Sequence, residues 1–401
     1  MNANENIRRY AAVFGFAILL LVPSFDSIYK YLGLTGIAIY FIVGTVILLL
    51  GYRFAVPFLK ASLSERAANI LAGLTFLCLI AVVAIGYPLA NSGRFGGGSD
   101  ADEALIMAAK AIASGIYPYT QVTYLGNLIS PMPGAVFFGM PFSLTGLFQF
   151  QNVFWFGVLF FLIRHLSGRG SIGLGLSWLL LVLCPTVIWN FVTGSDYATN
   201  TIYIAILMWI LVRKCAETEA PEWQRIIPAI LLGIGLSSRS NFILMMPLLL
   251  SALVQNAGWR PAIKYLAISG VIFMLVTVPF WLHDPVGFAP LAAQGSKLKD
   301  LVDVLPYANI IIPGTAGILT LVLALRKLPV DCAALFRNCA VVQLFILLFT
   351  CTVSSIKAGH PDIFLRQSGY GMFTLIFAAI SAWIFCFRIG YETKANRNLE
   401  F

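Results

Sequence analysis

Three carboxylic acids stand within four residues of one another in this chain: Asp100, Asp102 and Glu103. Clustered carboxylates can remove a proton from a hydroxyl group or hold a divalent cation such as Mg²⁺ or Mn²⁺. The same spacing also fits a structural role, because an acid followed three residues later by Glu is the pattern of a capping box at a helix start. These three acids are the leading candidates for catalytic or metal-binding residues. Which of these roles they can have depends on the helices and loops that position them.

The elements around this cluster are those of a membrane protein. The 401 residues are 59% hydrophobic and 11% charged, and several apolar runs are long enough to cross a bilayer. We therefore expect an all-α fold, a polytopic transmembrane helical bundle that forms a single integral membrane domain over residues 1–401. The net charge is +9, but the basic residues punctuate the ends of apolar runs. We expect membrane lipid and no nucleic acid as a partner.

Hydrophobicity predicts about 10–12 membrane spans. The candidate spans are residues 11–24, 32–51, 67–89, 146–163, 172–190, 197–212, 227–238, 241–253, 264–282, 306–325, 338–356 and 369–387. With the N-terminus in the cytoplasm, 18 of the 26 Lys and Arg residues lie on the cytoplasmic side, as expected of a membrane protein. Residues 90–130 then form the first long outer loop.

Two segments affect this orientation. Residues 131–144 contain three prolines and are expected to be re-entrant or interfacial, because a full crossing would leave only 10 basic residues inside. Residues 227–253 are expected to form a short hairpin with Arg239 at its outward-facing tip, because one long helix would put this arginine in mid-bilayer. In the outer loop, apolar residues at helical spacing predict an interfacial helix over 102–114 that lies on the membrane surface.

Several short motifs follow one another between residues 67 and 255. They are an acid pair before a helix (Asp102–Glu103), a tyrosine motif after it (Tyr117–Tyr119), a proline-led segment (from Pro131), an acid before a span (Asp196) and a glycine-rich hairpin (Gly233–Arg239). In order and in predicted sidedness they resemble a module of the GT-C glycosyltransferases, polytopic enzymes that use polyprenyl-phosphate sugars. The chain departs from that pattern because more than one span precedes the acidic loop. It also has Gln149, Gln151 and Asn152 where a basic residue is usual.

The resemblance implies a function. The chain would move a sugar from a polyprenyl-phosphate donor to a glycan, lipid or protein acceptor on the extracytoplasmic face, with inversion at the anomeric carbon. The outer loop over 90–130 would be the catalytic loop, with Asp102 as general base and Glu103 or Asp100 orienting it or holding Mg²⁺ or Mn²⁺. A bacterial inner membrane, with the site facing the periplasm, is the implied location.

Other residues receive binding roles on this interpretation. Arg239 fits a donor phosphate, since a guanidinium binds phosphate oxygens with two hydrogen bonds, although an arginine at a hairpin tip can also extend to lipid headgroups. Arg366 and Lys297 are expected to assist it. The residues expected to contact the substrates are Tyr117, Tyr119, Tyr124, Asp196 and His360. The tyrosines also fit an aromatic belt, and the aspartate also fits a helix N-cap.

Two other classes of protein stay open. A transporter or flippase of a lipid-linked or anionic substrate predicts charges deep within spans and an internal repeat. The spans here are almost free of charge apart from Arg239, and the two halves do not resemble each other. An O-antigen ligase or polymerase would place its site in the late loop with His360 and Arg366, and this loop is short.

Overall fold

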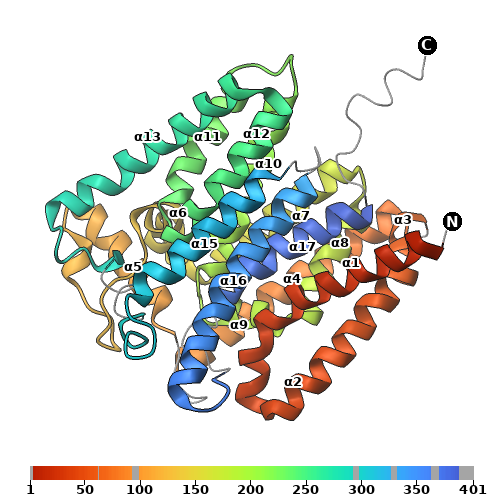
Figure 1. Ribbon diagram of the computed structural model, residues 1–401, viewed down its shortest axis with the longest axis horizontal. Coiled ribbons are helices and arrows are strands. Elements are labelled where there is room, and N and C mark those ends of the chain that lie inside the picture. Colours follow the sequence, from red (N-terminus) through yellow and green to blue (C-terminus); the bar gives the residue numbers. More distant parts are fainter. Residues whose placement is uncertain are drawn as a thin grey trace.

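The computed structural model describes residues 3–61, 63–92, 99–291, 298–326, 332–362 and 370–387 of the chain. The regular elements of these residues are helices, and the only pairing of extended segments among them is an isolated bridge between Val122 and Leu128. The expectation of an all-α fold is therefore confirmed. Figure 1 shows the long helices side by side in one bundle.

The helices match the predicted spans closely. The α-helices are α1 (Ala3–Leu21), α2 (Phe25–Leu50), α3 (Val56–Ala61), α4 (Glu65–Asn91), α5 (Ala101–Ala113), α6 (Pro133–Thr145), α7 (Gln151–Ser167), α8 (Gly170–Leu183), α9 (Pro185–Val192), α10 (Tyr197–Ala216), α11 (Trp223–Leu236), α12 (Met246–Ala257), α13 (Trp259–His283), α15 (Ala308–Leu325), α16 (Cys332–Ala358) and α17 (Gly371–Phe387). Shorter turns are the 3-10 elements η1 (Val22–Ser24), η3 (Pro118–Thr120), η4 (Phe148–Phe150) and η5 (Ser240–Met245), and the π-helical turn η2 (Gly51–Ala55). Every predicted span overlaps one or two of these helices.

Fewer helices than predicted have the full length of a membrane span. Among the described residues, seven helical segments are long and apolar enough to cross a membrane, and one of these is the continuous run Tyr10–Ala61, which contains η2. The number rises to eight if α8 and α9, bent by 86°, form one broken span. Helices such as α11 and α17, with 14 and 17 residues, fall short of the roughly 20 residues that a crossing needs. These long apolar helices are typical of an integral membrane protein.

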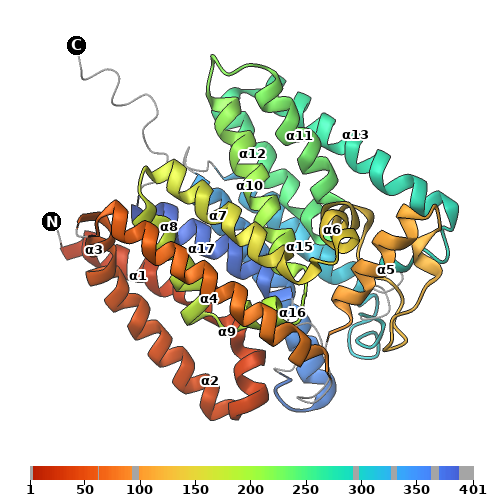
Figure 2. The same cartoon turned by 180° about the vertical axis from the view of Figure 1, so that it is seen from behind.

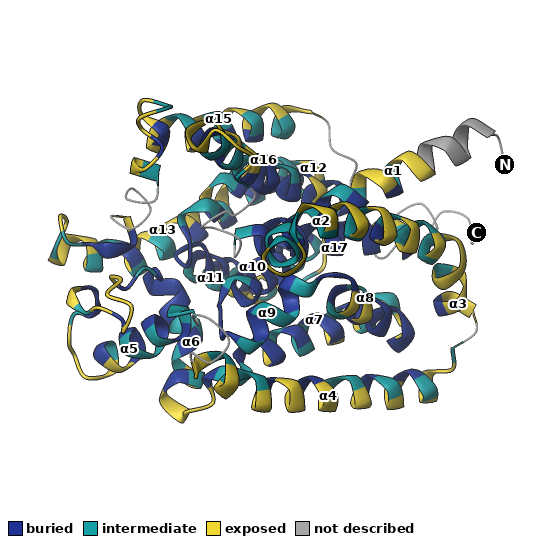
Figure 3. Cartoon of the chain, turned by 90° about the horizontal axis from the view of Figure 1, so that it is seen from below, coloured by how far each residue is buried: buried dark blue, intermediate teal, exposed yellow. Residues whose placement is uncertain are grey.

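The centre of the bundle is formed by α10 and α17, most of whose residues are buried (Figure 3). A helix that is apolar on all faces is stable only when other helices or lipid surround it. The peripheral helices α2, α4 and α13 instead expose large apolar side chains, among them Ile42, Leu77 and Leu275. Such an outward apolar surface is stabilised by lipid and not by water.

The bundle has two ends, which we name the α3 end and the α5 end after the helices that lie there (Figures 1 and 2). At the α3 end, the Lys60 ammonium donates a hydrogen bond to the Cys386 carbonyl at 2.9 Å, so α3 lies beside the end of α17. At the opposite end, a Cβ atom on Gly371 would lie 3.0 Å from Pro23, so α17 begins beside η1. In the orientation that the basic residues predict, the α5 end faces outward.

The helix of the acidic loop is placed differently from the prediction. α5 packs on α6 and buries its apolar face there, with Leu105, Ala108 and Ala109 inaccessible to solvent. The sequence predicts this face to lie on the membrane surface. The physical reason is that α6 offers a complementary apolar face made partly of small residues, Ala135 and Gly139 among them, so that the two helices cover each other.

α6 is a short helix held against α11, and this agrees with the prediction of a re-entrant or interfacial segment over 131–144. It has 13 residues, and the Gly134 amide donates to the Ser237 carbonyl at 2.9 Å. A Cβ atom on Gly134 would lie 2.0 Å from the Ile234 carbonyl oxygen, so only glycine allows this approach. The predicted hairpin over 227–253 is also present, as the separate helices α11 and α12.

Candidate functional site

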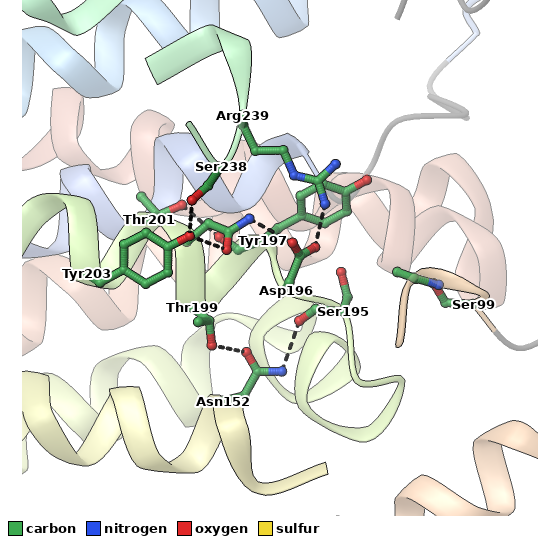
Figure 4. A network of polar contacts seen from close by, with 12 residues as sticks. Ser99, Asn152, Ser195, Asp196, Tyr197, Thr199, Thr201, Tyr203, Ser238 and Arg239 are labelled. Carbon is green, nitrogen blue, oxygen red and sulfur yellow. Dashed lines mark hydrogen bonds and ion pairs between the residues drawn. The ribbon is translucent and has the colours of Figure 1, made fainter. Parts of the chain in front are cut away.

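A buried ion pair lies at the α5 end, where α10 begins (Figure 4). Arg239 donates from Nη2 to Asp196 Oδ1 at 2.6 Å, and the two residues are only 5% and 1% exposed. The Tyr197 ring centroid lies 4.8 Å from the guanidinium carbon, which is a cation–π geometry. Arg239 stands between the two helices of the predicted hairpin and turns inward to this carboxylate, so it does not extend to lipid headgroups; that this end of the bundle faces outward stays a prediction. Asp196 precedes α10 but makes no side-chain cap.

The first turns of α10 hold the acid of this pair in place. Asn200 Nδ2 donates to Asp196 Oδ2 at 2.8 Å, and the Tyr203 hydroxyl donates to Asn200 Oδ1 at 2.7 Å and contacts the Ser238 hydroxyl. Positions three and four residues apart on a helix share a face, so these side chains form one continuous row. Linked hydrogen bonds of this kind strengthen one another in a buried setting. Both partners of the ion pair are thus fixed before any ligand arrives.

Asn152 on α7 braces the segment that leads into α10. Its Nδ2 donates to the carbonyl oxygens of Asn190 at 3.2 Å and Ser195 at 2.9 Å, and its Oδ1 accepts from the Thr199 hydroxyl at 2.8 Å. This asparagine is uncharged and buried. Asn152 donates hydrogen bonds to the backbone, and the buried cation of the site is Arg239, in the turn after α11.

Asp102 is buried on the first turn of α5. Its Oδ2 accepts hydrogen bonds from the Tyr87 hydroxyl at 2.5 Å and from Asn91 Nδ2 at 3.1 Å, both on the last turns of α4. Burial raises the pKa of this carboxyl, and the hydrogen bonds from Tyr87 and Asn91 act in the opposite direction. A carboxylate with a raised pKa is a stronger base than an ordinary aspartate, which suits proton abstraction near neutral pH.

Gly194 connects Asp102 to the ion pair. It has a φ of +67°, and a Cβ atom added to it would lie 2.9 Å from Asp102 Cβ and 2.8 Å from the Tyr87 ring. Two residues later the chain reaches Asp196, the partner of Arg239. The short segment over 194–196 therefore touches the buried acid on one side and supplies the acid of the ion pair on the other.

The two other acids of the cluster point elsewhere. Asp100 Oδ2 accepts from the Thr123 hydroxyl at 2.6 Å and from Asn127 Nδ2 at 2.9 Å, while Glu103 Oε2 accepts from the Tyr124 amide at 2.8 Å. Asp100 also makes no side-chain cap on α5, so the capping-box alternative does not describe its role. Both acids hold the loop over 122–128 against α5. Within the described residues, no group of three His, Cys, Asp or Glu side chains is placed to hold a metal ion.

A cavity of about 440 Å³ opens beside Arg239, between η5, α15 and α16. Its polar side carries Arg239 together with Asn241 and Gln343, whose side-chain amides are hydrogen-bonded to each other at 2.8 Å. Most of its remaining lining is apolar and includes Leu244, Ile312 and Leu347. Arg239 Nε is buried and has no hydrogen-bond partner among the described residues. Asp102 does not line this cavity.

The three tyrosines expected to contact substrate differ in accessibility. Tyr119 is buried and donates its hydroxyl hydrogen to the Pro131 carbonyl at 3.2 Å, so its ring cannot stack on a sugar. Tyr117 is half-buried, and its ring packs on that of His283 with a centroid separation of 4.2 Å. Tyr124 is exposed on the loop over 122–128. Of the three, Tyr124 alone has the open ring face that stacking needs.

Of the remaining predicted residues, the structure describes His360. His360 lies exposed just beyond α16, and among the described residues its ring contacts the neighbouring Pro361 carbonyl, at 3.5 Å. Lys297 and Arg366 lie outside the described residues. The residues that sequence reasoning missed are Tyr87, Asn91, Asn152, Asn200 and Tyr203. Their signal was polar side chains at helical spacing inside otherwise apolar spans.

Comparison with the models of protein families, with curated proteins and with solved structures finds no match to this chain. A buried guanidinium with an unused donor, set beside a mostly apolar cavity, can bind an anionic group that carries an apolar chain. A buried carboxylate with a raised pKa, on the other side of the 194–196 segment, can accept a proton.

Proposed function

We propose that this protein is a GT-C-type glycosyltransferase that takes a sugar from a polyprenyl-phosphate donor. The observation that carries the proposal is the pair of buried groups joined by residues 194–196: the base candidate Asp102 and the phosphate-binding candidate Arg239. One group receives a proton and the other neutralises a leaving phosphate, and both are needed for direct displacement at an anomeric carbon.

The proposed reaction is a single displacement. Asp102 accepts the proton of the acceptor hydroxyl while the hydroxyl oxygen forms a bond to the anomeric carbon. The bond between that carbon and the phosphate oxygen breaks, and its electron pair leaves with polyprenyl phosphate. Arg239 stabilises the departing phosphate with the guanidinium donors that Asp196 does not occupy, since an arginine has five N–H groups. Attack from the opposite face gives inversion.

The cavity beside Arg239 is the proposed place of the lipid chain. Its apolar lining from η5, α15 and α16 suits a polyprenyl tail, and Arg239, Asn241 and Gln343 offer polar groups to the phosphate. In the predicted orientation, the site faces the periplasm of a bacterial inner membrane, where a glycan, lipid or protein acceptor would arrive. The GT-C-like module over residues 67–255 would hold both Asp102 and Arg239.

Lipid-linked sugar turnover tests this function. The purified protein in lipid nanodiscs is incubated with polyprenyl-phosphate sugars and an acceptor extract, and released polyprenyl phosphate is measured. We expect release that depends on the acceptor and that falls about a hundredfold or more in Asp102→Asn, while donor binding stays. Movement of intact lipid-linked sugar between leaflets without any release would instead support the flippase alternative.

A further inference from the structure

A second cavity, of about 570 Å³, is lined mainly by α1, α2, α3 and α8, helices that lie on the opposite side of the bundle from α13 (Figures 1 and 3). Helices α1 and α2 with the turn η2 form one wall, and α3, α8 and α17 complete it. Phe16, Leu48, Leu179 and Val182 are among its lining residues. No residue of the proposed transfer site takes part. The cavity is therefore a separate feature of this chain.

The lining of this cavity is almost wholly apolar and is open to the surroundings. Val182 on α8 is 80% exposed and lines it. The run Tyr10–Ala61, which supplies α1, α2, η2 and α3, is one of the segments apolar enough to cross a membrane. An apolar cavity open to the hydrocarbon region of a bilayer is filled by a lipid acyl chain, because neither water nor empty space is stable there.

Two basic residues stand at the α3 end of this cavity. Arg53 lies in η2 between the lining residues Tyr52 and Ala55, and it is exposed. Lys60 lies on α3 next to the lining residue Leu59. The segment from Gly51 to Ala61 contains no acidic residue. The next acid in the chain, Glu65, accepts hydrogen bonds from the Gly170 amide at 3.1 and 3.2 Å and is therefore engaged elsewhere.

The π-helical turn η2 is an independent observation at the same place. Gly51, Tyr52 and Ala55 belong to this widened turn and line the cavity. Single π-helical turns inside longer helices are uncommon and occur frequently at functional sites. Here the turn joins α2 to α3 at the point where the apolar cavity meets the two cations. The local backbone irregularity, the apolar cavity and the positive charge therefore coincide.

We propose that this cavity binds an anionic phospholipid. One acyl chain lies between the α1–α2 hairpin and α8, and the headgroup phosphate contacts Arg53 and Lys60. A basic residue near an anionic membrane surface contributes about 1 kcal/mol, which corresponds to about fivefold in affinity for each residue. In the predicted orientation, the α3 end faces the cytoplasm, so the lipid belongs to the inner leaflet.

Lipid retention in detergent tests this proposal. The full-length protein is incubated with phosphatidylglycerol or with phosphatidylcholine of identical acyl chains, passed through a desalting column, and the retained lipid is counted by native mass spectrometry. We expect about one phosphatidylglycerol per protein and at least fivefold less phosphatidylcholine. Equal retention of the two lipids, or retention of neither, overturns the proposal.

Two variants with matched controls locate the site. Arg53→Gln should lower phosphatidylglycerol retention about fivefold, whereas Arg66→Gln, which removes an exposed arginine of α4, a helix that contributes no residue to the cavity lining, should not. Val182→Trp should fill the cavity and lower retention, whereas Leu325→Trp, at a similarly exposed residue of α15, should not. Loss of retention in both members of either pair, or in neither, contradicts the assignment to this cavity.

Discussion

Asp196 and Arg239, 43 residues apart in the chain, form an ion pair from which solvent is almost wholly excluded. Removing one partner of such a pair leaves a buried charge uncompensated and costs about 3–5 kcal/mol of folding free energy. The pair thus joins the start of α10 to the turn between α11 and α12. Arg239 Nε has no hydrogen-bond partner in the part of the chain that the structure describes, and with the adjoining cavity this leaves the same guanidinium able to receive an anion.

Arg239→Lys separates these two roles. An ammonium keeps the positive charge beside Asp196, so we expect the melting temperature to change little. It lacks the planar fork that binds a carboxylate and a phosphate together, so affinity for polyprenyl phosphate should fall about tenfold. Titration in nanodiscs measures this affinity, with the exposed Arg260→Lys as the matched control. Equal affinity in all three proteins would leave Arg239 a structural role only.

The transfer rate should depend on the protonation of Asp102. Because burial raises the pKa of this carboxyl, the rate should decline on acidification at a higher pH than an ordinary aspartate would produce. Tyr87→Phe removes a hydrogen bond that lowers this pKa, so the acid limb of the pH–rate profile should move to still higher pH. An acid limb that stays in place in Tyr87→Phe argues against Asp102 as the base.

Gly194 should tolerate no side chain. Both Gly194 and Gly126 have positive φ, so an alanine costs about 1–2 kcal/mol of backbone strain at either position. Only at Gly194 does the new Cβ also collide with Asp102 and Tyr87, which adds about 1–3 kcal/mol. Thermal unfolding should show a larger loss for Gly194→Ala than for Gly126→Ala, and sugar transfer should fall only in the former. Equal losses of stability in the two variants would mean that the segment over 194–196 does not hold Asp102 in place.

Sidedness can be measured with cysteines at the two ends of the bundle. The basic residues place the α5 end outside and the α3 end in the cytoplasm. In a Cys78→Ser background, Ser92→Cys should react with an impermeant maleimide on intact cells, and Glu219→Cys should react only after lysis; both native residues are exposed. The reverse pattern would remove the proposed site from the outer face.

The sequence predicted where the helices lie because apolar runs and prolines are local signals. It also predicted that 131–144 does not cross as a full-length helix and that 227–253 is a hairpin, since charge placement constrains both. It could not predict that Asp196 and Arg239 pair, because two residues from different helices meet only through tertiary packing. For the same reason it left Asp100, Asp102 and Glu103 as one cluster, whereas their hydrogen-bond partners lie on different segments.

The α5–α6 contact shows a second limit. Leu105, Ala108 and Ala109 have the spacing of an amphipathic helix, and spacing alone does not distinguish a lipid-facing stripe from one that another helix covers. The length of α17 was also not expected of a span, because its 17 residues are fewer than the roughly 20 that a crossing needs. Other helices of the bundle bury most residues of α17, so its length need not match a bilayer.

The location of the bound lipid chain tests the central claim most directly. A polyprenyl phosphate that carries a diazirine in its first isoprene units is cross-linked by light to the protein in nanodiscs, and the modified residues are mapped by mass spectrometry. We predict adducts on cavity residues of α15 and α16 such as Ile312 and Leu347, reduced by excess unlabelled polyprenyl phosphate and by Arg239→Lys but not by Arg260→Lys. Adducts confined to peripheral helices such as α4 and α13, or unchanged in Arg239→Lys, would contradict the account.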